Sequence, residues 1–438
     1  MVRLILIGSA VLAALVFGEA DRTEVRAPSL KTNPNSIHLN ELIEEALNNN
    51  AELAALKHEV TVRDSQIGPK GSYEDPMVAV EAMNFPVNNL RRDQFGMTGV
   101  QLSLTQKIPF PGKLSKLSRV ASYSKDSQSS LFDKKRLELV RDIKKAYYGL
   151  FVLTKRREIL TEQKDLVRQI LASARNQYAL GKMAQAEVLS FQVEETNYLD
   201  QLLSVEREMR DMQGEINHLI GRADHQHYMA LSPDEPVKSH IDFSKVTQES
   251  IVKTALDKNP SIRAAHAETE AAEASLSYAQ WNYLPDFEFK LGYTFRQPSP
   301  GDAGTDFVSG MVGISVPIWA LSKQSEERRG AEALKMKSEA MLSETRNELS
   351  HRVHLAFASL EEASERLKLY DSGVLPLVRQ AVVAGKAAYL TRKIEYSTLL
   401  NLLNRRFQAE NSYYEALTTY QIKVAELEAL AGAPLEEL

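Results

Sequence analysis

The sequence predicts a mostly helical, internally duplicated protein that also carries a membrane β-barrel portion. First, one order of helix and strand patterns occurs twice, with an almost constant shift along the chain. Second, each copy holds a pair of segments of about ten residues with period-two alternation, as membrane barrel strands do. Third, helical periodicity then continues for lengths, such as residues 114–178, that exceed a compact domain.

Composition favours long elements and excludes several kinds of site. The 438 residues include only 20 glycines and 16 prolines, so turns are few. The absence of cysteine excludes disulfides, thiolate metal sites and a lipid-modified N-terminal cysteine. The formal net charge is −5 and Lys and Glu are interspersed, so we expect no nucleic-acid partner. Without a nucleophile elbow or a phosphate-binding glycine loop, no enzyme activity and no cofactor are predicted.

Residues 1–20 have the three-part pattern of a secretory signal peptide. Arg3 precedes an apolar run from Leu4 to Phe17, and the small residues Gly18 and Ala20 follow, so cleavage is expected after Ala20. The alternative is an uncleaved membrane anchor, but the run of 14 residues is shorter than the roughly 20 that span a bilayer. Residues 21–38 are then an N-terminal extension.

The duplicated unit is defined by matching residues. Ala46, Leu47 and Asn50 match Ala255, Leu256 and Asn259 at a shift of 209. Further pairs keep a shift of 208 to 211: Pro109 with Pro317, Tyr178 with Tyr389, Lys182 with Lys393, Leu219 with Leu430, and Gly221 with Gly432. We therefore predict two structural repeats, at 39–222 and 244–433, with a linker at 223–243 and a tail at 434–438.

Each repeat begins with a helix that is followed by two strands. The first repeat has strands at about 76–86 and 97–108, and the second at about 285–296 and 306–317. In the second repeat Phe287, Phe289 and Phe295 belong to an apolar face whose other side carries charges such as Lys290. We expect the aromatic face to contact lipid. A small sandwich with one solvated face is the alternative.

Two long helices follow the strand pairs, at about 114–178 and 322–388, and shorter helices return at 184–220 and 394–430. Apolar residues at spacings of three and four form a seam for packing against neighbouring helices. In the second long helix the seam is Val353, Ala356, Leu360, Ala363, Leu367, Tyr370, Val374, Leu377, Ala381, Ala384 and Ala388. Pro376 lies within this helix and removes a backbone hydrogen bond, so we predict a kink there.

The change from strand to helix is marked by turn-forming residues. Pro109 and Pro111 cannot donate to a sheet, and Gly112 permits a sharp turn before the basic helix that follows. Pro317 stands at the equivalent place in the second repeat. These four residues are predicted to convert barrel strands into long helices at a membrane surface.

Together these segments resemble the TolC-like outer-membrane efflux family, the outer-membrane component of tripartite efflux pumps, over nearly the whole mature chain. The resemblance rests on the duplicated unit, on "DPMVAVEAMNFP" followed by "LTQKIPFPGK", on "YALGK", and on residues 374–417. It implies a homotrimer in which each chain gives four strands to a twelve-stranded barrel that continues into an α-helical tunnel. It also implies an outer-membrane location in a Gram-negative bacterium, and partners in a periplasmic adaptor (a membrane fusion protein) and an inner-membrane pump of the RND type.

The resemblance also assigns roles to two tips and an entrance. Ala179, Leu180 and Gly181 are similar to one adaptor-docking tip, and Leu390, Thr391 and Arg392 to the other, although Arg392 replaces the usual small residue. An entrance gate is implied shortly after the second tip, where this chain has Glu395, Thr398 and Asn401. Three copies of Glu395 at a threefold axis would attract cations. The alternative is that Glu395 is an ordinary solvated helix residue.

Two histidine pairs are weak metal candidates. His225 and His227 lie in the linker, and His351 and His354 are three residues apart on the second long helix. Ordinary solvated residues are the better interpretation for both pairs.

The predicted function is a passive exit duct across the periplasm and the outer membrane. The strand-pair segments are most similar to the heavy-metal cation branch of the family, and drug efflux and type I protein secretion are alternatives. A periplasmic coiled-coil scaffold would explain the helices and the signal peptide but not the repeated strand pairs.

Overall fold

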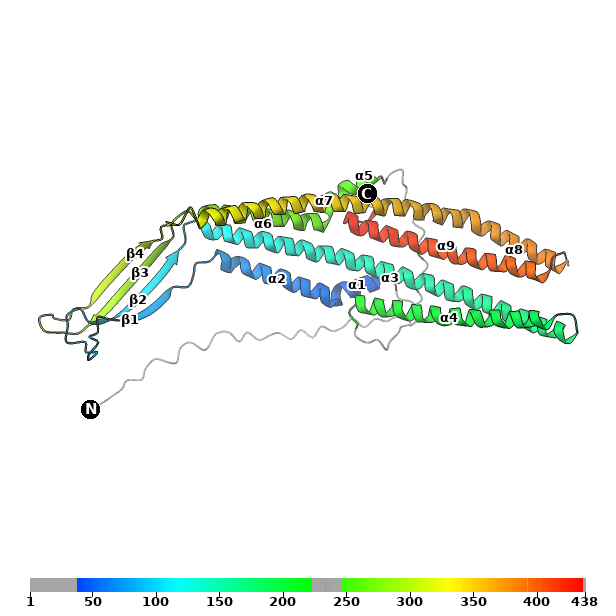
Figure 1. Cartoon of the computed structure of the whole chain (residues 1–438), viewed down its shortest axis with the longest axis horizontal. Helices are drawn as coiled ribbons and strands as arrows, with labels where there is room; N and C mark the ends of the chain where they lie inside the picture. The colour runs from blue at the N-terminus through cyan, green and yellow to red at the C-terminus, as the bar shows by residue number, and fades with distance from the viewer. Residues whose placement is uncertain (1–37, 223–232, 234–235, 237–245, 392, 436–438) are drawn as a thin grey trace, which may run out of the picture.

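The computed structural model describes residues 38–222, 233, 236, 246–391 and 393–435. Within them, a four-stranded sheet forms one end of an elongated molecule, and helices extend from it to two turns at the far end (Figure 1). The predicted signal peptide and most of the predicted linker lie outside the described residues.

The two repeats contribute equivalent elements. The first contains α1 (Leu39–Asn49), α2 (Ala51–Gly71), β1 (Met77–Met83), β2 (Gly99–Ile108), α3 (Lys113–Ala179) and α4 (Gln185–Leu219). The second contains α5 (Gln248–Lys258), α6 (Pro260–Trp281), β3 (Phe287–Arg296), β4 (Phe307–Ile314), α7 (Gln324–Lys368), the π-helical turn η1 (Leu369–Val374), α8 (Leu375–Leu390) and α9 (Tyr396–Ala431).

The single helix predicted before each strand pair is in fact two helices, which meet at Asn50 and at Asn259. The Asn50 side chain accepts a hydrogen bond from the Leu53 backbone, so it caps α2, and its amide donates to the Leu219 carbonyl at 2.9 Å. Asn259 makes the same pair of bonds, to the Ser261 backbone and to the Leu430 carbonyl. The matching asparagines therefore fix each helix break against the end of the returning helix.

A matching glycine completes this contact in each repeat. Gly221 has a φ of +76°, and a Cβ built on it would lie 2.4 Å from the Asn49 carbonyl oxygen. Gly432 has a φ of +74° beside the backbone of Lys258. The positive φ and the close backbone approach both require glycine, which explains why both glycines belong to the repeat pattern.

The four strands form one antiparallel sheet in the order β1-β2-β3-β4. All four strands are somewhat shorter than predicted, and two of them end three residues early. β1 ends at Met83 rather than 86, where Asn84 adopts a φ of 54° and its carbonyl accepts a hydrogen bond from the Thr98 hydroxyl. β4 ends at Ile314 rather than 317; the Ser315 backbone still donates to the Asp286 carbonyl, and β3 begins at the next residue, Phe287.

The sheet has one apolar face and one polar face. Register places Leu102 opposite Tyr293 and Tyr293 opposite Val308, so alternate residues of neighbouring strands share a side. The exposed members of the apolar face are Val78, Val80, Leu102, Leu104, Phe289, Leu291, Tyr293, Phe295, Val308, Val312 and Ile314. On the other face the buried Gln101 donates hydrogen bonds to Thr294 and to Ser309. The predicted aromatic face therefore lies on the exposed apolar side of the sheet.

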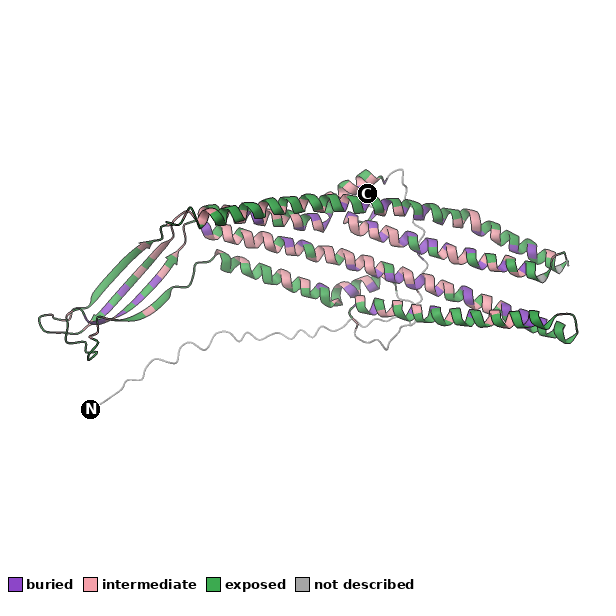
Figure 2. Cartoon of the chain, in the orientation of Figure 1, coloured by how far each residue is buried: buried purple, intermediate pink, exposed green. Residues whose placement is uncertain are grey.

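The long helices pack through the predicted seam. Leu139, Ile143 and Leu150 of α3 are buried against α1, α2 and α4 in one core cluster. An equivalent cluster packs α7 against α5 and α9, and Phe151 of α3 joins it to the first repeat. Figure 2 shows buried positions recurring along the facing sides of the helices, with the outer side of α7 exposed.

Where a kink was predicted at Pro376, the structure has the π-helical turn η1, which ends two residues before the proline. A π turn adds one residue to the helix, so every later side chain advances to a different face. Up to Leu367 the predicted seam is buried, but Leu377 is 67% exposed, and Ala381 and Ala384 are exposed as well. The positions packed inward are each one residue later: Val378, Val382 and Gly385. The predicted seam is therefore wrong at Leu377, Ala381 and Ala384, whereas Ala388 is half-buried.

Among the described residues, no helix combines the length and the apolar character that a membrane crossing requires.

Candidate functional site: the helical tips and the junction with the sheet

The first tip is a left-handed turn between α3 and α4. Leu180 caps α3, Gly181 has a φ of +68°, and the Lys182 backbone donates to the Gln177 carbonyl at 2.9 Å. This is the hydrogen-bond pattern of a Schellman motif, whose left-handed position favours glycine. Ala179, Leu180 and Gly181 are all exposed, and a Cβ on Gly181 would meet nothing within 4 Å. The tip therefore presents a close-packed backbone turn with free space around it.

The second tip repeats the hydrogen bonds of the first. α8 ends at Leu390, Thr391 caps it, and the Lys393 backbone donates to the Ala388 carbonyl at 2.8 Å. Arg392 lies outside the described residues. The two tips lie at the same end of the molecule, opposite the sheet (Figure 1).

The predicted gate residues lie at the start of α9. Glu395 is the N-cap residue and precedes the helix, rather than lying inside it as the predicted helix start at 394 implied. Its side chain makes no capping bond and is exposed, and Thr398 and Asn401 are exposed at spacings of three along α9. Thr398 and Asn401 therefore lie close together on one face of α9, and Glu395 immediately precedes that helix.

Below the second tip, an ion-pair cluster joins the repeats. Arg406 of α9 pairs with Glu162 of α3 and lies 3.6 Å from Glu410. Burial raises the pKa of Glu410, and the charge of Arg406 opposes that rise. The apolar side chains of Ile159, Val382, Leu399, Leu403 and Phe407 pack beside this cluster. Because Glu162 and Arg406 are 244 residues apart, no local pattern in the sequence indicates their contact.

The junction between the sheet and the helices joins both repeats through a buried lysine. The Lys113 side chain is only 6% exposed, and its Nζ donates to Asp286 Oδ1 and to the Leu284 carbonyl, both at 2.8 Å. Asp286 also accepts from the Phe110 backbone at 2.8 Å. The first strand-to-helix break is therefore tied to the start of β3.

Pro109, Pro111 and Gly112 form the turn at this break. Gly112 has a φ of +101°, and a Cβ on it would lie 2.4 Å from the Trp281 ring, so only glycine fits. At the second break the connection is longer: residues 315–323, which include Pro317, separate β4 from α7. The predicted start of that helix at 322 is therefore two residues too early.

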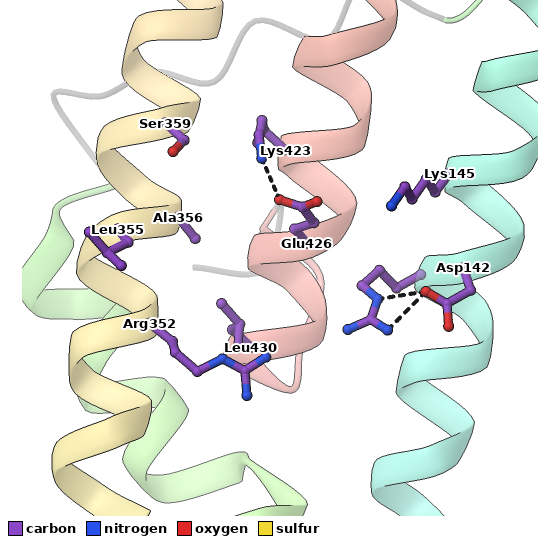
Figure 3. A pocket seen from close by; sticks show the side chains of 10 residues that line it. Asp142, Lys145, Arg352, Leu355, Ala356, Ser359, Lys423, Glu426 and Leu430 are labelled. Carbon is purple, nitrogen blue, oxygen red and sulfur yellow. Dashed lines mark hydrogen bonds and ion pairs between the residues drawn. The ribbon is translucent and has the colours of Figure 1, made fainter.

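A groove of 430 Å³ lies between α3, α7 and α9 (Figure 3). Its lining includes four cationic side chains, Arg141, Lys145, Arg352 and Lys423, and two carboxylates, Asp142 and Glu426. Each carboxylate accepts a hydrogen bond from a neighbouring cation of the groove. The groove therefore lacks the group of uncommitted carboxylates that a bound metal cation would need.

Comparison with known proteins decides the family. The family model described as "Outer membrane efflux protein" matches residues 42–222 and 251–433.

The chain belongs to the outer membrane efflux protein family.

Individual relatives are distant in sequence. Outer membrane protein TolC of Vibrio cholerae serotype O1 (strain ATCC 39315 / El Tor Inaba N16961) is 19% identical over 306 residues, which is 68% of each chain. The solved structure of CusC has a TM-score of 0.73 at 15% identity and covers 92% of this chain and 96% of its own. VceC from Vibrio cholerae has a TM-score of 0.73 at 18% identity, covering 91% and 96%. The resemblance found in the sequence is thus confirmed, and so is the outer-membrane location.

The outer membrane efflux protein family consists of channel proteins rather than enzymes. His351 and His354 are exposed on α7, and His225 and His227 lie outside the described residues. Among the described residues, no three His, Asp or Glu side chains gather closely enough to hold a metal ion.

Proposed function

We propose that this efflux-family chain forms the outer-membrane duct of a tripartite efflux system, as a homotrimer. The observation that carries the proposal is the isolated four-stranded sheet, which has an exposed apolar face and two open edges. β1 and β4 each pair on one side only within the described chain. An open edge favours pairing with another chain, and a closed barrel removes every edge. Pairing of β4 with β1 of the next copy in a trimer gives twelve strands around one pore.

The helices then extend the pore away from the membrane. α3 alone has 67 residues, which at 1.5 Å per residue is about 100 Å. In this arrangement the two tips face the periplasmic adaptor and the pump of the RND type. The sheet contacts outer-membrane lipid.

We propose heavy-metal cations as the cargo class, because the strand-pair segments resemble the heavy-metal cation branch of the family. A passive duct has no need of a resident metal site, so we assign no role to either histidine pair. Drug efflux and type I protein secretion are the alternatives. Restoration of resistance to copper, silver or zinc salts, rather than to drugs, in cells that lack the native duct would support the metal cargo.

Replacement of Gly181 by Trp is expected to abolish export while trimers still assemble. The free space around Gly181 accepts the ring, but the ring would keep an adaptor hairpin away from the backbone of the turn. Gly181→Asn is the matched control, because asparagine tolerates a positive φ and adds little bulk. Export should be measured in cells alongside the amount of trimer in the outer membrane. Normal export by a well-expressed Trp variant would show that this tip does not dock the adaptor.

Neutralising Glu395 is expected to reduce cation selectivity and block by divalent ions. Three carboxylates that converge in a narrow pore attract cations, and their mutual repulsion favours bound divalent ions. Glu395→Gln should therefore change the reversal potential in planar bilayers, whereas Glu187→Gln, in the first turn of α4, should not. An unchanged selectivity in Glu395→Gln would place the constriction elsewhere, and Thr398 and Asn401 would be tested next.

A further inference from the structure

The connection between β4 and α7 exposes large apolar side chains beside the sheet. Ile318, Trp319 and Leu321 are 74%, 67% and 94% exposed. Val316, which is 69% exposed, lies two residues beyond the end of β4. The connection lies at the boundary between the sheet and the helices (Figure 1), so exposed apolar side chains occur at that boundary as well as on the sheet.

A polar pocket of 480 Å³ lies under this connection. Its lining comes from the end of α6, the start of α7, the buried Lys113 and the connection itself. The polar lining residues, here called the polar floor, include Lys113, Asn282, Asp286, Lys323, Gln324 and Glu327. The apolar lining residues Val316, Ile318 and Trp319, here called the apolar wall, belong to the same site.

One hydrogen-bond donor of the polar floor makes no bond within the described residues. Lys113 Nζ has three donors, and two of them bond to Leu284 and Asp286. The third donor therefore remains for an acceptor group of a ligand in the pocket.

The charges of the floor are balanced. Lys113 and Lys323 supply two positive charges, and Asp286 and Glu327 supply two negative charges. A net anion gains little from such a site, whereas a molecule with a phosphate and an ammonium group can pair with both signs. The phosphate can accept from the lysines, and the ammonium can donate to Glu327.

We propose that this pocket binds the headgroup of a zwitterionic aminophospholipid, such as phosphatidylethanolamine, from the membrane leaflet at the helical end of the sheet. The acyl chains then lie along Val316, Ile318 and Trp319, continuous with the apolar face of β4. Tryptophan at the edge of a bilayer places its ring among the lipid tails and its N–H near the headgroups. The inference rests on the outer-membrane location and on the apolar face of the sheet, and it is independent of the cargo and of the adaptor.

The test is lipid binding to purified, delipidated trimers by native mass spectrometry, with phosphatidylethanolamine and phosphatidylglycerol of identical acyl chains as probes. The wild-type protein should retain phosphatidylethanolamine at least fivefold better than phosphatidylglycerol. Glu327→Gln should remove that preference, because the carboxylate that accepts from the ammonium loses its charge. Trp319→Ser should lower retention of both lipids about tenfold, because the apolar wall is lost.

Matched controls separate the pocket from general effects on α7. Glu332→Gln removes an exposed carboxylate of α7 outside the pocket, and Met336→Ser removes an exposed apolar side chain there. Both should behave as the wild type does. Equal retention of the two lipids by the wild type would overturn the proposal, and so would a wild-type trimer that retains neither lipid because a neighbouring subunit covers the pocket. Loss of the preference in Glu332→Gln as well would also overturn it.

Discussion

Deletion of Ser372 is expected to destabilise the tip half of the second repeat and to abolish export. Ser372 is an exposed residue of the π-helical turn η1, and its removal leaves one residue fewer before α8. The helix can then continue with ordinary α-helical bonds, but every residue of α8 turns by about 100°. Leu375 and Val382, now 5% and 4% exposed, would leave the core, at a cost of about 1.5–3 kcal/mol each.

The measurement is the thermal stability of the trimer on gels, together with proteolysis of the tip half. Ser372→Ala is the control, because it preserves chain length and removes only a hydroxyl that bonds to the Lys368 carbonyl. The control should match the wild type in both assays. A deletion variant with wild-type stability and export would mean that the π turn does not set the face that α8 buries.

Replacing Asp286 by Leu is expected to have the second large effect, a loss of about 2 kcal/mol at the junction between sheet and helices. The change leaves the Lys113 ammonium buried without a carboxylate and the Phe110 backbone without its acceptor. We expect a smaller loss of stability than for a fully buried ion pair, because the Asp286 side chain is 45% exposed. Lys113→Met should cost less, because the carboxylate that it leaves behind is half in water.

Urea-dependent unfolding of the purified variants measures their stabilities, and so tests whether Asp286→Leu costs more than Lys113→Met. The double variant Lys113→Met with Asp286→Leu should be more stable than Asp286→Leu alone, because no unpaired charge remains buried. Asp93→Leu breaks an exposed pair with Arg91 in the loop between β1 and β2 and should cause no measurable change. If Lys113→Met proved the more damaging single change, the buried ammonium would not be the group that needs its partner.

Local patterns predicted the long elements well. The three-and-four spacing of apolar residues such as Leu139, Ile143 and Leu150, interrupted by Arg157 and Lys164, predicted a helix over 114–178, and α3 spans Lys113–Ala179. Period-two alternation likewise indicated all four strands and the shared side of Phe289 and Phe295. These features depend on neighbours in sequence, so the sequence alone carries the signal.

Features that depend on packing could not be predicted in the same way. Pro376 predicted a kink, whereas the structure has a π turn that packs against α9, a helix distant in sequence. The Lys113–Asp286 pair spans 173 residues, and neither residue lies in a motif that calls for the other. Asn50 and Asn259 were recognised in the sequence as matching residues of the two repeats. Their bonds to the Leu219 and Leu430 carbonyls depend on the fold and could not be predicted from the matching alone.

The most direct test of the membrane duct is site-specific labelling of the sheet in intact outer membranes. The chain contains no cysteine, so single replacements at Phe289 and Lys290 need no further changes. Neighbouring residues of β3 point to opposite faces, and Phe289 lies on the exposed apolar face. Phe289→Cys should react with lipid-phase probes and Lys290→Cys with water-borne ones. The reverse pattern, or equal labelling of both by water-borne probes, would contradict a membrane barrel.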